Sequence, residues 1–168
     1  MYSKKLFDLF EQFSSVDIAI SIDDIGDRFE IQRGGKWQIV TENLANIFSH
    51  NSDKIKCYIM PTVNIQNVYY LDNVYNWANQ ENYPVSLNFL ENPQFLNIDF
   101  MTVAARDAVY TKYKNHNVEA LSQIAERVKG SPGCNGSEFI AHHKNLDNLR
   151  SESFQNSHKK IALLMGIV

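Results

Sequence analysis

The sequence has little of what marks several common classes of protein. Its 168 residues include only two cysteines, Cys57 and Cys134, which are far apart and match no metal-binding spacing. So few cysteines exclude a disulfide framework and fit a reducing compartment. With 7 glycines and 4 prolines, the chain has no low-complexity tract and no flexible linker. A chain of this length can bury a hydrophobic core.

Long apolar runs and an excess of one charge are also missing. No run approaches the roughly 18 apolar residues of a membrane span. The first residues, MYSKKLFDLFEQF, carry charges within their apolar part and lack a small-residue cleavage site, which argues against a signal peptide. The net charge of −3 gives no general attraction to nucleic acid or to an anionic membrane. We therefore expect a cytoplasmic protein that binds neither.

The most informative segment that is present runs from Ser15 to Trp37, SVDIAISIDDIGDRFEIQRGGKW. Residues 16–23 alternate between large apolar side chains and small or polar ones, as in a strand with two different faces. The polar face becomes more hydrophilic towards its C-terminal end. This pattern predicts a strand of a parallel sheet, with helices on the apolar face and a ligand site beside the polar one.

Apolar spacing along the chain predicts an α/β fold. Strands are expected over 16–23, 54–64 and 85–90, and Pro61 should lie near the end of the second strand or at a bulge. Helices and strands then alternate, which implies parallel βα units with right-handed crossovers. After Glu91 only helices are expected. The predicted helices cover residues 2–13, 37–49, 67–80, 102–114, 117–129, 137–149 and 151–165.

Each predicted strand ends in polar residues at alternate positions. In a parallel sheet these ends meet at one edge, where hydroxyls, amides and a carboxylate would face a polar ligand. The alternative is that strand ends are polar only because they meet loops. The residues are Ser21 and Asp23, Thr62 and Asn64, and Ser86 and Asn88.

The 15–37 segment resembles the fourth strand and the following helix of radical S-adenosylmethionine (radical SAM) enzymes. The shared features are Ser-Ile-Asp at the strand end, a short acidic loop, Arg33-Gly34-Gly35, Trp37, and Asn43 in the next helix. The closest resemblance is to radical SAM proteins with a truncated auxiliary-cluster ("twitch") region, some of them from phages. Their pattern has glycine after Ser-x-Asp, where this chain has Asp24.

The resemblance implies a site for S-adenosylmethionine. Ser21 and Arg33 would hold the carboxylate of its amino-acid end, with Asp23 close by. Asn64 and Asn88, at the ends of the other two strands, would face the same cavity. The chemistry of the family is reductive cleavage of S-adenosylmethionine to a carbon radical that abstracts hydrogen from a substrate.

A second departure from the family is the absence of its CxxxCxxC cluster motif. The chain therefore resembles the second half of a partial TIM-like (β/α)6 barrel, residues 1–100, followed by a helical extension, residues 101–168. One hypothesis is a portion of an enzyme whose 4Fe–4S cluster comes from another polypeptide, so that the chain alone is inactive. The other is a non-catalytic half-barrel that binds a partner or a second copy of itself.

Two further groups of residues have alternative interpretations. Asp23, Asp24 and Asp27 could suggest a magnesium site, but an acidic turn explains them more simply. His142 and His143 are adjacent and would point about 100° apart on a helix, so they suit one shared metal poorly. We expect His143 to be packed in the core.

Overall fold

The computed structural model describes residues 3–167, so the start of the helix predicted over 2–13 lies outside the described residues. The chain divides into two compact units. The first contains residues 1–61 and 73–86, and the second contains residues 62–72 and 87–168. The boundary predicted between residues 100 and 101 lies within the second unit.

The first unit contains a parallel sheet. β1 (Val16–Ile20) pairs with β2 (Ile55–Ile59) in parallel, with Ile18 opposite Cys57. At its end, β2 forms a parallel bridge from Ile59 to Val85. The pairing of β1 with β2 is parallel, as predicted, whereas the strand predicted over 85–90 meets this sheet only through the bridge at Val85. The protein has mixed α/β structure, with far more helix than strand.

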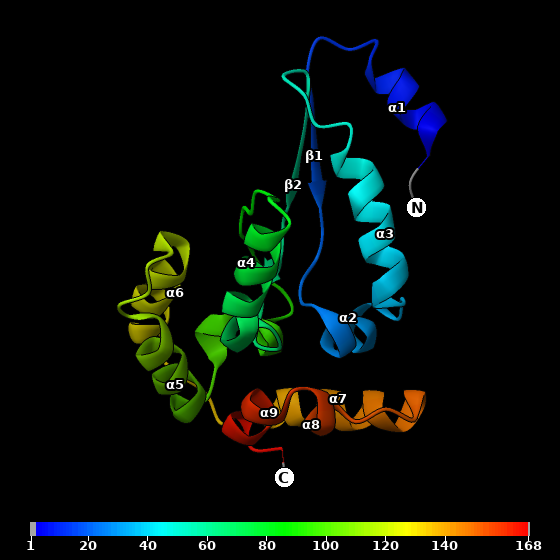
Figure 1. The fold of residues 1–168 in the computed structure, drawn as a ribbon. Helices are drawn as coiled ribbons and strands as arrows, with labels where there is room; N and C mark the ends of the chain where they lie inside the picture. Colours follow the sequence, from blue (N-terminus) through cyan, green and yellow to red (C-terminus); the bar gives the residue numbers. More distant parts are fainter. Residues whose placement is uncertain (1–2, 168) are drawn as a thin grey trace. The chain divides into compact units, whose positions relative to one another are not determined.

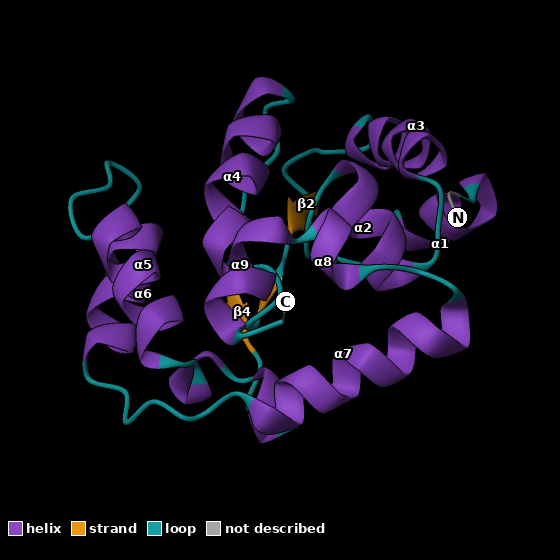
Figure 2. Ribbon diagram, turned by 90° about the horizontal axis from the view of Figure 1, so that it is seen from below, coloured by secondary structure: helices purple, strands orange, loops and turns teal. Residues whose placement is uncertain are grey.

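Helices cover the apolar face of this sheet, as the alternation predicts. α1 (Lys4–Phe10) and α3 (Trp37–Phe48) bring Phe7, Ile47 and Phe48 against the apolar residues of both strands. A second cluster joins Ile22, Phe29, Leu44 and Ile59. α4 (Leu71–Gln80) contributes Trp77, whose ring centroid lies 5.0 Å from that of Trp37. α1 lies on the far side of α3 from α4 (Figures 1 and 2).

One helix of the first unit is absent from the sequence-based prediction. Residues Gly26–Arg33 form α2, whereas we expected a loop that ends in Arg33-Gly34-Gly35. Phe29 is the one residue that this helix buries, so it has no apolar stripe to reveal it. Gly34 ends the helix at φ 70°, a left-handed conformation that suits glycine, and its N–H donates to the Glu30 carbonyl.

The strand predicted over 54–64 is divided in two. β2 ends at Ile59 and β3 (Thr62–Val63) begins after Pro61, which has no N–H to donate to a neighbouring strand. β3 pairs in parallel with β4 (Asn88–Phe89), and this pair belongs to the second unit. Pro61 therefore lies just beyond the end of β2, which confirms its predicted position near the end of a strand.

The second unit is mainly helical, and α5 (Val103–Tyr113) and α6 (Glu119–Lys129) lie side by side in it (Figures 1 and 2). The helices predicted over 102–114, 117–129 and 137–149 are confirmed within two residues at each end. The helix predicted over 151–165 is wrong as a single helix, because His158 has a non-helical backbone at φ −114° and ψ 42°. Its helical elements are η1 (Val68–Tyr70), η2 (Gln94–Leu96), η3 (Ile98–Phe100), α5 (Val103–Tyr113), α6 (Glu119–Lys129), α7 (Ser137–Arg150), α8 (Phe154–Ser157) and α9 (Lys159–Met165).

A stack of rings holds the last helices together. Phe154 lies between His143, with 3.8 Å between ring centroids, and His158, with 4.4 Å between centroids. His143 is 2% exposed and His158 is fully buried. Burial, followed by the neighbouring His142, lowers the pKa of His143 from 6.5 to about 3. The expected core position of His143 is confirmed.

The depressed pKa makes the stability of the second unit depend on pH. An unfolded His143 takes up a proton below its ordinary pKa of 6.5, whereas the folded residue resists protonation down to about 3. The free energy of unfolding should therefore be highest above pH 6.5 and fall by about 2 kcal/mol between pH 7 and pH 5. Urea unfolding followed by circular dichroism at both pH values measures this change.

His143→Phe should remove most of this pH dependence, since a phenyl ring fills the stack without titrating. His50→Phe is the matched control, because His50 also stacks on a phenylalanine, Phe7, but lies in the first unit. If the free energy of unfolding of His143→Phe kept the same pH dependence as the wild type, His143 would not be its source.

Candidate functional site

The second face of the β1–β2 sheet carries polar side chains that no helix of the first unit covers. Asp17 and Ala19 of β1 are exposed, as is Lys56 of β2. Asp17 is the direct cross-strand neighbour of Lys56, and Ala19 is the neighbour of Tyr58. Opposite charges at neighbouring positions suit a solvent-facing sheet and also a ligand that carries both charges.

A hollow of about 640 Å³ lies over this face. A carboxylate, an ammonium group, a phenol and a hydroxyl line it together with the turn after α3. Such a lining can hydrogen-bond a polar ligand of moderate size. The lining residues are Asp17, Asn51, Ser52, Lys56, Cys57, Tyr58, Pro84, Val85 and Ser86.

At the C-terminal end of β1, the structure brings two of the predicted site residues into contact. The Arg33 Nη2 atom lies 2.5 Å from Oδ2 of Asp23. Asp23 is 7% exposed, while the Arg33 side chain is 43% exposed. Ser21, two residues before Asp23, is exposed. α2 makes this contact possible, because the helix reverses the direction of the chain after β1 and places Arg33 beside Asp23.

The sequence-based prediction did not include a neighbouring ion pair between Asp24 and Arg28. Asp24 is fully buried and accepts from Arg28 Nε and from the Ile25 N–H, both at 2.8 Å. Burial raises the pKa of Asp24 above its usual value, and the Arg28 guanidinium partly offsets this rise. The available signal was an Asp and an Arg at i and i+4, a helical spacing. Both oxygens are used within the loop and the first turn of α2, so Asp24 has a structural role.

Asn64 and Asn88 belong to the second unit, whereas Ser21, Asp23 and Arg33 belong to the first. Asn64 is buried, and its amide is used within its own turn: Nδ2 donates to the Thr62 carbonyl and Oδ1 accepts from the Gln66 N–H. Asn88 is exposed on β4. Their shared cavity with Ser21 stays a prediction.

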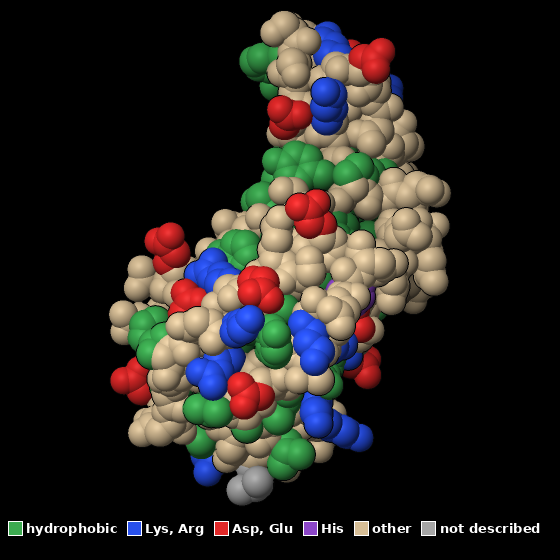
Figure 3. All heavy atoms as spheres, turned by 90° about the vertical axis from the view of Figure 1, so that its left-hand side faces the viewer, with side chains coloured by type: hydrophobic (Ala, Val, Ile, Leu, Met, Phe, Trp, Pro, Cys, Tyr) green, Lys and Arg blue, Asp and Glu red, His purple; other side chains and the backbone are tan. Residues whose placement is uncertain are grey.

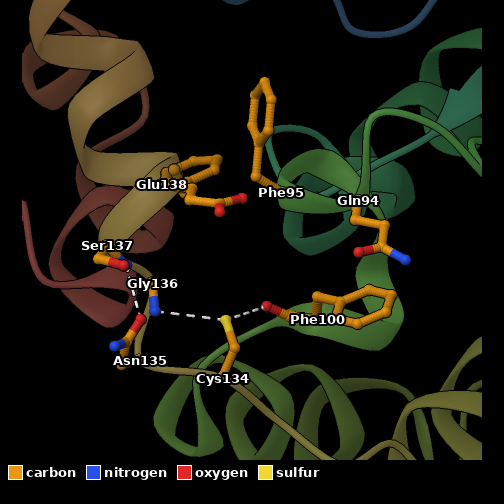
Figure 4. A pocket seen from close by; sticks show the side chains of 9 residues that line it. Gln94, Phe95, Phe100, Cys134, Asn135, Gly136, Ser137 and Glu138 are labelled. Carbon is orange, nitrogen blue, oxygen red and sulfur yellow. Dashed lines mark hydrogen bonds between the residues drawn. The ribbon is translucent and has the colours of Figure 1, made fainter.

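The second unit has a hollow of its own, of about 240 Å³. Cys134 is one of the residues that line it, and Figure 4 shows its Sγ atom between the Gly136 N–H, which donates to it at 3.3 Å, and the Phe100 carbonyl. The loop then leads into α7, where the Ser137 N–H donates to Oδ1 of Asn135. Cys134 is exposed, whereas Cys57 is 2% exposed in β2.

The two thiols should differ in reactivity. Burial shields Cys57 and raises its pKa, which lowers the fraction of reactive thiolate. We expect iodoacetamide to modify Cys134 at least about 10-fold faster than Cys57 in the folded protein, as measured by peptide mass spectrometry. Urea should equalise the two rates, and Cys134→Ser should leave only the slow site. Equal rates in the folded protein would contradict the burial of Cys57.

On the face shown in Figure 3, acidic and basic side chains are interspersed and not separated by sign. Among residues 3–167, no three His, Cys, Asp or Glu side chains form a group that could hold a metal ion. In that same range, no helix has the length and apolar character needed to cross a membrane. No family model, no curated protein and no solved structure matches the chain.

Proposed function

We propose that the chain is the C-terminal portion of a radical SAM-type enzyme and contributes part of the cavity for S-adenosylmethionine and substrate. In this proposal its parallel βα units are the second half of a partial (β/α)6 barrel, and another polypeptide supplies the 4Fe–4S cluster. The observation that carries the proposal is the Asp23–Arg33 contact beside the exposed Ser21, at the C-terminal end of β1.

The arrangement of the first unit supports this proposal. Its strands are parallel, its helices cover the apolar face, and its polar face borders a hollow lined by Asp17, Lys56 and Tyr58 among others. Ligands of such sheets bind at the C-terminal ends of the strands. Ser21 and Asp23 follow β1 directly and therefore occupy that end.

The chemistry of Arg33 suits a carboxylate ligand. A guanidinium has five N–H donors in a planar fork, so contact with Asp23 through Nη2 leaves other donors for a second carboxylate. Asp23 fixes the position of the guanidinium, and Ser21 offers a hydroxyl close to the same strand end. Charge-assisted hydrogen bonds of this kind are roughly twice as strong as neutral ones.

The residues of this chain do not fit an iron–sulfur cluster. A cluster with one open iron needs three neighbouring thiolates, and the chain has two cysteines. Cys57 lies on the helix-covered face of β2, and Cys134 lies in a loop of the second unit. For this reason the proposal assigns the cluster to another polypeptide and no reaction step to this chain alone.

A second candidate function is a non-catalytic binding or interaction module. The hollow over Asp17, Lys56 and Tyr58 favours it, because this polar face offers a ligand site that needs no cluster. A coding sequence with CxxxCxxC beside the gene would favour the enzyme, and a solitary gene would favour the module.

Titration calorimetry with S-adenosylmethionine tests the proposed site. Without the iron that would form a second anchor, we expect a dissociation constant of roughly 1 mM, or about −4 kcal/mol. Ser21→Ala and Arg33→Gln should each weaken binding by about 10-fold or more, the effect of losing a hydrogen bond to a charged group. Ser21 is exposed, so its substitution should leave the fold intact.

Lys36→Gln is the matched control, because Lys36 is also a cation near the start of α3 but is paired with Glu30 at 2.7 Å. It should bind S-adenosylmethionine as the wild type does. Equal binding by the wild type, Arg33→Gln and Ser21→Ala would remove both residues from the site.

Anaerobic reconstitution with iron and sulfide tests the second part of the proposal. The purified chain should show no stoichiometric cluster in its absorption spectrum, because it cannot provide three clustered thiolates. Cys134→Ser should give the same spectrum. A stoichiometric cluster on the chain alone, lost in Cys134→Ser, would show that this chain holds the cluster and would overturn the proposal.

A further inference from the structure

The two edges of the sheet in the first unit differ in how their backbone groups are satisfied. Val16 N–H donates to the Lys54 carbonyl, and the Ile20 carbonyl accepts from Met60 N–H. Even-numbered residues of β1 therefore face β2, and the backbone groups of Asp17 and Ala19 face away from it.

The outer edge of β2 is protected along its length. Side chains of the turn after α3 receive two of its N–H groups, with Ile55 donating to Oγ of Ser52 at 3.1 Å and Cys57 donating to Oδ1 of Asn51 at 2.7 Å. Ile59 then pairs with residues 84–86 through backbone bonds. No such partner is found for the outward groups of Asp17 and Ala19 among the described residues, so the edge of β1 is open.

An exposed apolar stripe lies on the same side of the first unit. Leu6 and Leu9 of α1 are 45% and 48% exposed, and Phe13 in the turn that follows is 54% exposed. The helix uses Phe7 and Phe10 to pack on the covered face of the sheet. α1 is the outermost helix of the first unit on this side, because it lies beyond α3 (Figures 1 and 2). No further helix of the first unit therefore covers the stripe.

We propose that β1 and α1 form a docking surface for a second copy of this chain. β1 would pair with β1 of the partner in antiparallel fashion around a twofold axis at Ile18. Because the two β1 strands would run in opposite directions, the two α1 helices would lie at opposite ends of the interface, and each apolar stripe would face the partner copy. This inference concerns the chain on its own and goes beyond the proposed function, in which the same edge of β1 would join the missing half of the barrel.

The sequence of β1 suits this symmetric pairing. With Ile18 on the axis, Asp17 lies opposite the partner's Ala19, and these two residues exchange the outward N–H and carbonyl bonds. Ser15 lies opposite the partner's Ser21. The two Asp17 carboxylates are then diagonal neighbours, whereas an axis at Asp17 would place them directly opposite each other. An isologous interface of this kind closes after two copies.

Sedimentation velocity at micromolar concentrations tests the proposal. The wild type should be a dimer. Ala19→Pro removes one outward N–H while sparing the bonds to β2, because proline is tolerated on an edge strand where its position faces outward. Leu9→Glu places a charge in the apolar stripe. Each variant should raise the dimer dissociation constant by at least about 10-fold.

Ile39→Glu is the matched control for Leu9→Glu, since Ile39 is an equally exposed apolar residue at 56% but lies on α3. It should remain a dimer. If a variant fails to fold, hydrogen exchange of the wild type replaces it: protection of the Asp17 and Ala19 amides should increase with protein concentration. A monomeric wild type, or a dimer that Ala19→Pro and Leu9→Glu both leave intact, would overturn the proposal.

Discussion

The buried carboxylate of Asp24 fixes the path of the chain out of β1, and the candidate site depends on that path. A buried charge is tolerated only when its partners replace water, and here Arg28 and the Ile25 N–H do so. Loss of one partner of such a pair typically costs about 3–5 kcal/mol. The pair joins the loop to the first turn of α2, and α2 in turn delivers Arg33 to Asp23. Glycine stands at the Asp24 position in the radical SAM pattern, so this chain holds the loop by a contact that the pattern does not require.

The apolar face of the sheet was predictable because period-two alternation leaves only one way to bury its residues. Val16, Ile18 and Ile20 lie under helices, as the pattern indicates. The parallel order of the strands followed from the alternation of helices and strands. In contrast, α2 was not predictable from periodicity, since it buries only Phe29. Arg33-Gly34 is a signal for its end, a basic residue and a glycine at a helix C-terminus, whereas the sequence-based prediction places this segment in the loop before the next helix.

The candidate site was partly predictable for a related reason. Polar residues at strand ends can be counted in a sequence, so Ser21 and Asp23 were identified, and the resemblance added Arg33. The direct contact between Asp23 and Arg33 depends on the unpredicted α2, which reverses the chain. Asn64 shows why such a prediction can fail. An asparagine after a strand can hydrogen-bond a ligand or the backbone of its own turn, and the sequence does not distinguish the two. The Asn64 amide bonds to Thr62 and Gln66.

β1 connects the open edge of the sheet with the candidate site. Its residues are held by one neighbouring strand, and its C-terminal end leads directly to Ser21 and Asp23. A strand with one neighbour opens more readily than a strand between two, so the loop after it inherits that freedom. Any polypeptide that binds only the folded edge stabilises β1 by mass action. It also reduces the ordering cost that a ligand at Ser21 and Arg33 must overcome. Occupation of the edge and binding at the strand end should therefore be positively coupled, because β1 and the Ser21 that follows it take part in both.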